Sequence, residues 1–166
     1  MPRTGLLLLG LWLGLVVASW AMASASFRTV DRVLGPAMNP ELGRRLDPLP
    51  SEDRRTVLRH LASELNRWMF GAGGAAQIAL ALCVVALAWP AGGAQRYLLV
   101  AAAALVLGQL VAARSIVELG RSIDFLPRPL PHDLARRFGG LHAAYVISDL
   151  LKAGLLVAAA WIGRRA

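Results

Sequence analysis

Four long apolar segments constrain the fold of this chain more than any other feature of its sequence. They comprise residues 5–27, 71–89, 97–117 and 138–163. Since an α-helix rises about 1.5 Å per residue, each segment can cross the roughly 30 Å hydrocarbon core of a bilayer. Backbone polar groups in lipid must be satisfied within the segment itself, which favours helices. We therefore predict an all-α integral membrane protein, a four-transmembrane-helix bundle that forms one membrane domain over residues 1–166.

Composition supports a membrane protein and argues against binding to nucleic acid. Hydrophobic residues make up 57% of the chain, above the roughly 45–50% that is typical of soluble domains. The net charge is +8, but the arginines gather at the ends of the apolar segments and mix with acids in the segments between them. Membrane proteins use this arrangement to set their orientation, so the partner that we expect is the lipid bilayer.

The distribution of basic residues predicts the orientation in the membrane. Eight arginines lie in residues 28–70 and five in residues 114–137, whereas the other side holds Arg3, Arg96, Arg164 and Arg165. By the positive-inside rule, we expect the charged loops 28–70 and 118–137 in the cytoplasm and both termini outside a bacterial inner membrane.

The first apolar segment has a second interpretation, a secretory signal peptide. It follows Arg3, has a leucine-rich core, and ends near small residues such as Ala21 and Ala23 that resemble a cleavage site. Cleavage and export would carry the next eight arginines across the membrane, against the positive-inside tendency. We therefore expect an uncleaved first helix, with cleavage as the alternative.

Residues 51–68 have the pattern of an amphipathic helix that precedes the second span. Ser51 is a predicted N-cap, and Glu52 and Asp53 would lie in the first turn, where the helix dipole favours acids. Apolar side chains then recur at helical spacing. We expect this cytoplasmic helix either to lie on the membrane surface or to pack on the bundle. It should continue into the second span as one long bent helix, since Gly71 allows a bend.

A candidate intramembrane polar site lies on the third and fourth spans. At 100° per residue, Asp149 and Lys152 lie on the same helical face as His142, and ionisable groups in lipid are costly unless they face protein or water. The functional interpretation is a proton or ion relay or a site for a polar substrate; the alternative is a structural contact in which the charges neutralise each other. The full candidate set is Arg114, Glu118, His142, Tyr145, Asp149 and Lys152.

Two further groups could extend this site towards the cytoplasm. Arg114 is a predicted partner of Asp149, and Glu118 of an arginine in the first loop, unless both anchor at the headgroups. We also expect Arg114, Glu118 and His142 to lie at similar depth. A candidate cytoplasmic mouth lies before the second span and comprises Glu64, Asn66 and Arg67. The alternative is a belt of residues at the membrane interface.

No motif predicts a metal, a cofactor or a catalytic site. The histidines at 60, 132 and 142 lack ligand spacing, and the single cysteine, Cys83, lies within a span. No nucleophile–base order or phosphate-binding loop is present. We therefore expect a protein that is not an enzyme. An intramembrane enzyme would require Glu118, His142 and Asp149 to converge on one cavity.

Four stretches carry a resemblance to a known family. They are AMASASFRTV, ELNRWMF, VAARSIVELG and RFGGLHAAYVISDLLK. With them the chain resembles the transmembrane-protein-205-like family of four-helix membrane proteins, a domain of unknown function. The resemblance implies an arginine that leaves the third helix, here Arg114, and a Phe-x-x-x-His element that opens the fourth, here Phe138 and His142. The activity of the family is not established, so the resemblance implies an architecture only.

The functional prediction is a non-enzymatic accessory or self-associating membrane subunit. Small residues in 71–76 and 101–104 permit close helix contact, which favours a homo-oligomer or a membrane-protein partner. The alternative is a small-solute, ion or proton transporter whose pathway runs along His142, Asp149 and Lys152.

Overall fold

The described part of the chain folds into five α-helices, four of them long. The computed structural model describes the chain except residues 37, 91 and 166 and the side chain of residue 165. Within the described residues, all regular structure is helical: α1 (Arg3–Val33), α2 (Pro40–Leu46), α3 (Ser51–Ala88), α4 (Gly93–Ile123) and α5 (His132–Arg165). The prediction of an all-α fold is confirmed.

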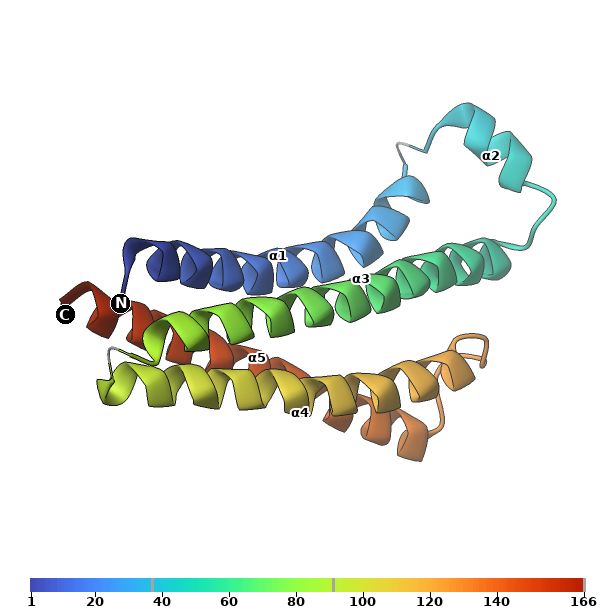
Figure 1. The fold of residues 1–166 in the computed structure, drawn as a ribbon. Helices are drawn as coiled ribbons and strands as arrows, with labels where there is room; N and C mark the ends of the chain where they lie inside the picture. Colours follow the sequence, from blue (N-terminus) through green and yellow to red (C-terminus); the bar gives the residue numbers. More distant parts are fainter. Residues whose placement is uncertain (37, 91, 166) are drawn as a thin grey trace.

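The four long helices form an up-and-down bundle (Figure 1). Helix α1 packs on α3 and α5, and α4 packs on the same two helices, so each helix has two antiparallel neighbours. Both termini lie at the end where α3 turns into α4. The opposite end carries α2 and the α4–α5 connection, and we call it the charged end because residues 28–67 and 114–137 hold 13 of the 17 arginines.

All four long helices are apolar and long enough to cross a membrane. The chain is therefore a multi-pass membrane protein. Helices of 31 to 38 residues measure roughly 46–57 Å, well beyond the roughly 30 Å hydrocarbon core. The uncharged stretch of each helix lies nearer the end of the bundle that holds the two chain termini. Most of the excess length therefore projects at the charged end.

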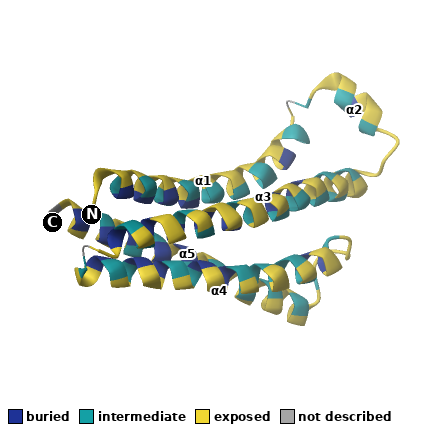
Figure 2. Ribbon diagram, in the orientation of Figure 1, coloured by how far each residue is buried: buried dark blue, intermediate teal, exposed yellow. Residues whose placement is uncertain are grey.

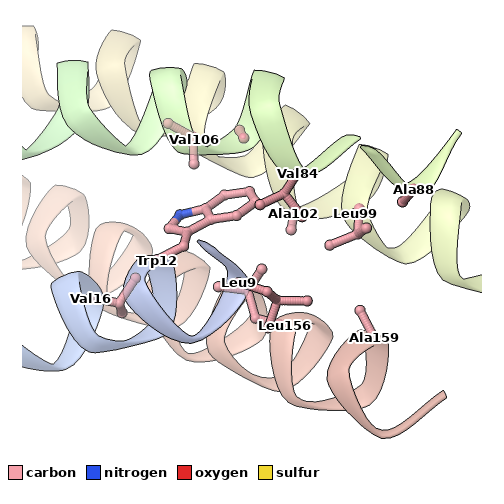
Figure 3. Close-up of a cluster of buried hydrophobic side chains, with 11 residues drawn as sticks. Leu9, Trp12, Val16, Val84, Ala88, Leu99, Ala102, Val106, Leu156 and Ala159 are labelled. Atoms are coloured by element: carbon pink, nitrogen blue, oxygen red, sulfur yellow. The ribbon is translucent and has the colours of Figure 1, made fainter. Parts of the chain in front are cut away.

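The core is a thin layer of side chains between the helices (Figure 3). Trp12 on α1 is its largest member and is fully buried, with Val84 of α3, Leu99 of α4 and Leu156 of α5 also within the layer. Outward faces are exposed, as Figure 2 shows along the whole bundle, and many of the exposed side chains are large and apolar. Leu7, for example, is 75% exposed. Such faces suit a lipid surrounding, where apolar side chains need no burial in protein.

Residues 51–70 are the first half of α3, which runs unbroken to Ala88 and packs on the bundle, so the predicted continuation into the second span is confirmed. Ser51 begins this helix as expected, but Pro50 occupies the cap position and no side chain caps it.

Helix α2 was not predicted, since the sequence analysis assigned residues 28–70 to a charged loop and expected a helix there only from Ser51. Asn39 caps it by accepting hydrogen bonds from the backbone N–H groups of Glu41 (2.9 Å) and Leu42 (3.2 Å). With Pro40 at its first position, a capping asparagine starts a helix efficiently, which the sequence could have revealed.

Candidate functional site

Asp149 and Lys152 turn into the bundle, as the sequence suggested. They lie one turn apart on α5, with 4% and 0% of their surface exposed, and the Lys152 Nζ atom is 2.6 Å from Asp149 Oδ1. The pair forms because α5 presents this face to α4 and α1, so neither charge meets lipid. Each charge is neutralised by the other, which is the condition for keeping ionised groups at this depth.

Gln109 of α4 bridges the two charges. Its amide nitrogen donates to Asp149 Oδ1 at 2.7 Å, and its oxygen accepts from Lys152 Nζ at 2.6 Å. A side-chain amide is neutral and can donate to a carboxylate and accept from an ammonium at once. Gln109 therefore closes a three-membered ring of polar contacts between α4 and α5.

Trp20 of α1 completes the network. Its indole Nε1–H donates to Asp149 Oδ2 at 2.9 Å, so both carboxylate oxygens accept hydrogen bonds from protein groups. The network therefore joins three of the four long helices, α1, α4 and α5. We call these four residues, Trp20, Gln109, Asp149 and Lys152, the polar clamp.

Further polar rungs lie along the bundle axis. The buried Trp12 Nε1–H donates to Gln77 Oε1 of α3 at 3.3 Å, and buried Gln95 of α4 donates to the Ala159 carbonyl of α5 at 2.9 Å. All three spanning glutamines thus lie inside and join neighbouring helices. Interhelical hydrogen bonds of this kind stabilise membrane bundles by about 0.6–2 kcal/mol each.

A small cavity adjoins the polar clamp on its charged-end side. Its volume is about 10 Å³, which is room for about one water molecule. Two of its lining groups are polar amides and one is a phenol; the full set is Phe70, Gly74, Gln77, Val106, Gln109, Leu110, Ala113 and Tyr145. It offers space for a bound water but not for an organic solute.

His142 and Tyr145 lie outside the polar clamp. His142 is exposed and stacks on Phe138 of the same helix, with ring centroids 6.2 Å apart. Tyr145 is half-buried, meets Phe70 edge to face, and contributes only its backbone carbonyl, which accepts from Gln109 at 3.4 Å. The predicted line of His142, Tyr145, Asp149 and Lys152 is therefore buried only at its inner pair, Asp149 and Lys152.

The predicted partners of Arg114 and Glu118 are wrong. Both side chains are exposed, and Asp149 pairs with Lys152 in place of Arg114. The prediction that Arg114, Glu118 and His142 lie at similar depth agrees with how α4 and α5 align. Gln109 meets Asp149 and Gly120 approaches Phe138, so His142 lies level with the segment between Arg114 and Glu118. An intramembrane enzyme would require Glu118, His142 and Asp149 to converge on one cavity. They do not converge, since His142 and Glu118 are exposed whereas Asp149 is buried.

A second polar cluster ties α3 to α4 at the charged end. Arg67 donates to both oxygens of Asp124, at 2.8 and 3.0 Å, and to Glu64 at 2.5 Å. Arg121 holds the other side of Glu64 at 3.1 Å, and His60 Nδ1 lies 2.8 Å from Asp124 Oδ2. A two-pronged arginine–carboxylate contact is among the stronger ionic hydrogen bonds. We call these five residues the charged-end lock.

Gly120 makes the charged-end lock possible. A Cβ atom at this position would lie 3.0 Å from Arg67 Nη2, so the glycine leaves room for the guanidinium to reach Asp124 across α4. Burial alone would raise the pKa of the Asp124 carboxyl group, but hydrogen bonds and charge from Arg67 and His60 outweigh burial. The pKa therefore lies below the ordinary value of 3.8.

The predicted cytoplasmic mouth is only partly assembled. Glu64 and Arg67 meet in the charged-end lock, whereas Asn66 faces the other way and donates to Ser26 of α1 at 2.8 Å. His60, Glu64 and Asp124 bring one ligand atom each within 4.8 Å of one another, a spacing that can hold a metal. Arg67 already bonds both carboxylates, however, so its positive charge occupies the place that a metal ion would need.

The sequence analysis did not single out Gln109 and Trp20 of the polar clamp or Asp124 of the charged-end lock, all of which carry decisive contacts. A lone glutamine or tryptophan in a span gives no charge signal. A signal was available: Gln77 and Gln109 interrupt otherwise apolar spans, and a buried amide needs partners.

Comparisons with protein-family models, curated proteins and solved structures find no match for this chain. The resemblance to the transmembrane-protein-205-like family therefore stays a prediction.

Proposed function

We propose that this protein acts as a non-enzymatic membrane subunit through its outer surface, either by associating with itself or by binding a membrane partner. In this proposal the polar clamp is a structural element that sets the packing of α1, α4 and α5. We also infer that the charged end faces the cytoplasm, because 13 of the 17 arginines lie in residues 28–67 and 114–137.

The observation that carries the proposal is the closure of the polar clamp. Lys152 is fully buried, and its Nζ atom is held by Asp149 and Gln109 at 2.6 Å each. Both oxygens of Asp149 are also occupied by protein donors. A transport site must exchange its bound solute with water, and a catalytic site must admit a substrate. The adjoining cavity of about 10 Å³ supports neither.

The small-residue segments give less support to self-association than the sequence suggested. A Cβ atom on Gly74 would lie 2.9 Å from Leu110 of α4, and Ala102 is fully buried, so part of both segments serves packing within one chain. The outer face of α1 is more open. Added Cβ atoms at Gly10 and Gly14 would meet no atom within 4 Å, and these glycines lie beside exposed Leu7 and Leu11.

The test is the state of assembly of the full chain. Native mass spectrometry and cross-linking, in mild detergent and in lipid nanodiscs, should give a homo-oligomer or a stoichiometric membrane-protein partner. A protein that is strictly monomeric in both media and carries no partner would contradict the proposal. Substituting Asp149 with asparagine should lower stability without changing the ion permeability of proteoliposomes.

One observation favours the alternative, a proton or ion transporter. The water-sized cavity lies between the polar clamp and the charged end, and Gln77 and Gln109 line it. A bound water there could link Asp149 to solvent when the helices open. This alternative predicts proton flux into proteoliposomes that falls to the level of empty liposomes on Asp149→Asn. Flux that is absent, or that survives the substitution, would remove it.

A further inference from the structure

An apolar groove runs between α1 and α3 on the outside of the bundle. It encloses about 350 Å³ and is lined by Met22, Ala25, Ser26, Thr29, Val30, Val33, Leu58, Leu61, Ala62, Leu65 and Met69. Figure 1 shows the cause, since α1 diverges from α3 as both approach the charged end. Leu61 and Leu65 are 65% and 48% exposed, so the groove is largely uncovered in the single chain.

The groove crosses the boundary of the apolar spans. Because the helices are antiparallel, Met22 and Met69 mark one end and Val33 and Leu58 the other, about 16 Å away for 11 residues of helix. The Met22 end lies within the uncharged part of α1, which ends at Phe27. The remaining half continues beyond the hydrocarbon core, where exposed leucines cost free energy unless something covers them.

Exposed arginines lie next to lining residues at the outer end of the groove. Arg32 precedes Val33 on α1, and Arg55 and Arg59 flank Leu58 on α3. Arg55 lies 3.6 Å from Asp31, whereas Arg32 and Arg59 form no ion pair with any described residue. The groove is thus apolar where it enters the membrane and positively charged where it leaves it.

The shape and lining of the groove favour a lipid as its occupant. An extended hydrocarbon chain suits an apolar groove about 16 Å long. The arginines add a requirement for an anion at the outer end, and guanidinium groups bind phosphate oxygens well.

We propose that this groove binds one acyl chain of an anionic phospholipid, with the lipid phosphate held by Arg32 and Arg59. The lipid would cover Leu61 and Leu65 beyond the hydrocarbon core and would fill the space between α1 and α3. The site is distinct from the polar clamp and from the charged-end lock, and it does not depend on the proposed function.

The experiment measures lipid binding to the purified full chain. Phosphatidylglycerol and phosphatidylcholine with identical acyl chains are added to protein in mild detergent, and bound lipids are counted by native mass spectrometry. The wild-type chain should bind phosphatidylglycerol about tenfold or more tightly than phosphatidylcholine, since two arginines near a phosphate contribute at least that preference. The deacylated headgroup, glycerophosphoglycerol, should not compete, because it lacks the chain that fills the groove.

Two pairs of variants separate the groove from its charges. Ala25→Phe places a ring in the groove from an exposed position and should weaken binding of both lipids about tenfold, whereas Ala21→Phe, exposed one turn earlier outside the groove, should not. Thr29→Phe is the second groove variant if the first fails to fold. Arg32→Gln with Arg59→Gln should abolish only the preference for phosphatidylglycerol. The control Arg44→Gln with Arg45→Gln on α2 removes equal charge and should preserve it.

Three results would overturn the proposal. The first is equal binding of the two lipids by the wild-type chain. The second is unchanged binding by a folded groove variant. The third is a groove variant that dissociates an oligomer without changing lipid binding, because the groove would then belong to a second copy of the chain.

Discussion

Substituting Lys152 with methionine tests the central claim about the polar clamp. Methionine matches the length of the lysine stem and removes only the ammonium group. Lys152 is fully buried. Removing its ammonium group leaves the Asp149 carboxylate, 4% exposed, with two neutral donors, Gln109 and Trp20. Breaking a buried ion pair from one side typically costs about 3–5 kcal/mol, and we expect a value near the lower end because both donors remain.

The double variant Asp149→Asn with Lys152→Met gives the sharper measurement. Asparagine keeps an oxygen that can accept from Trp20 or Gln109, so no charge is buried and few donors lose their partner. We expect this variant to cost about 1–2 kcal/mol, the order of one or two weakened hydrogen bonds. Asp149→Asn alone leaves the ammonium unpaired and should cost about 3 kcal/mol. The two single substitutions together should therefore exceed the double variant by at least about 2 kcal/mol.

The assay is reversible unfolding in mixed micelles of a mild detergent and sodium dodecyl sulfate, followed by far-ultraviolet circular dichroism. Fluorescence is unsuitable as the only readout, because Trp20 bonds directly to Asp149. Leu151→Met, at an exposed neighbouring position, is the control and should be neutral. A cost below about 1 kcal/mol for Lys152→Met, or strict additivity in the double variant, would refute the reasoning.

Two further predictions concern the packing of α3 on α4. Because the pKa of Asp124 is lowered in the folded protein, its contribution to stability is fully present above the ordinary value of 3.8 and is lost as the pH falls through the lower folded value. Unfolding measured from pH 7 to pH 3 should therefore lose stability only at the acid end, and less so in Asp124→Asn; identical pH profiles would contradict this. Gly74→Val should destabilise the bundle by about 1 kcal/mol, since even a Cβ atom there would lie 2.9 Å from Leu110 Cδ2 and the leucine side chain would have to shift. Gly71→Val, where a Cβ atom meets no atom within 4 Å, should be tolerated, and equal thermal stability of the two variants would count against the close approach of α3 and α4.

Much of the architecture could be predicted from the sequence, because whether a segment forms a membrane-spanning helix depends mainly on its own length and composition. The apolar length of segments 5–27, 71–89, 97–117 and 138–163, which hold few charges, is sufficient to predict four spans. The inward position of Asp149 and Lys152 was also predictable, since a pair of charges in lipid has few other places to go. Helix α2 was missed although its capping Asn39 and Pro40 were visible.

The partners of the buried charges were decided only by tertiary structure. Asp149 had several possible partners along the sequence, including Arg114, and the rotation of α4 about its axis selected Gln109. A sequence records which face of each helix is polar, but the choice between faces on neighbouring helices depends on register and axial rotation. Register and axial rotation are set by many small packing contacts along the bundle, such as the close approach of Gly74 to Leu110. No single residue in the sequence therefore predicts them.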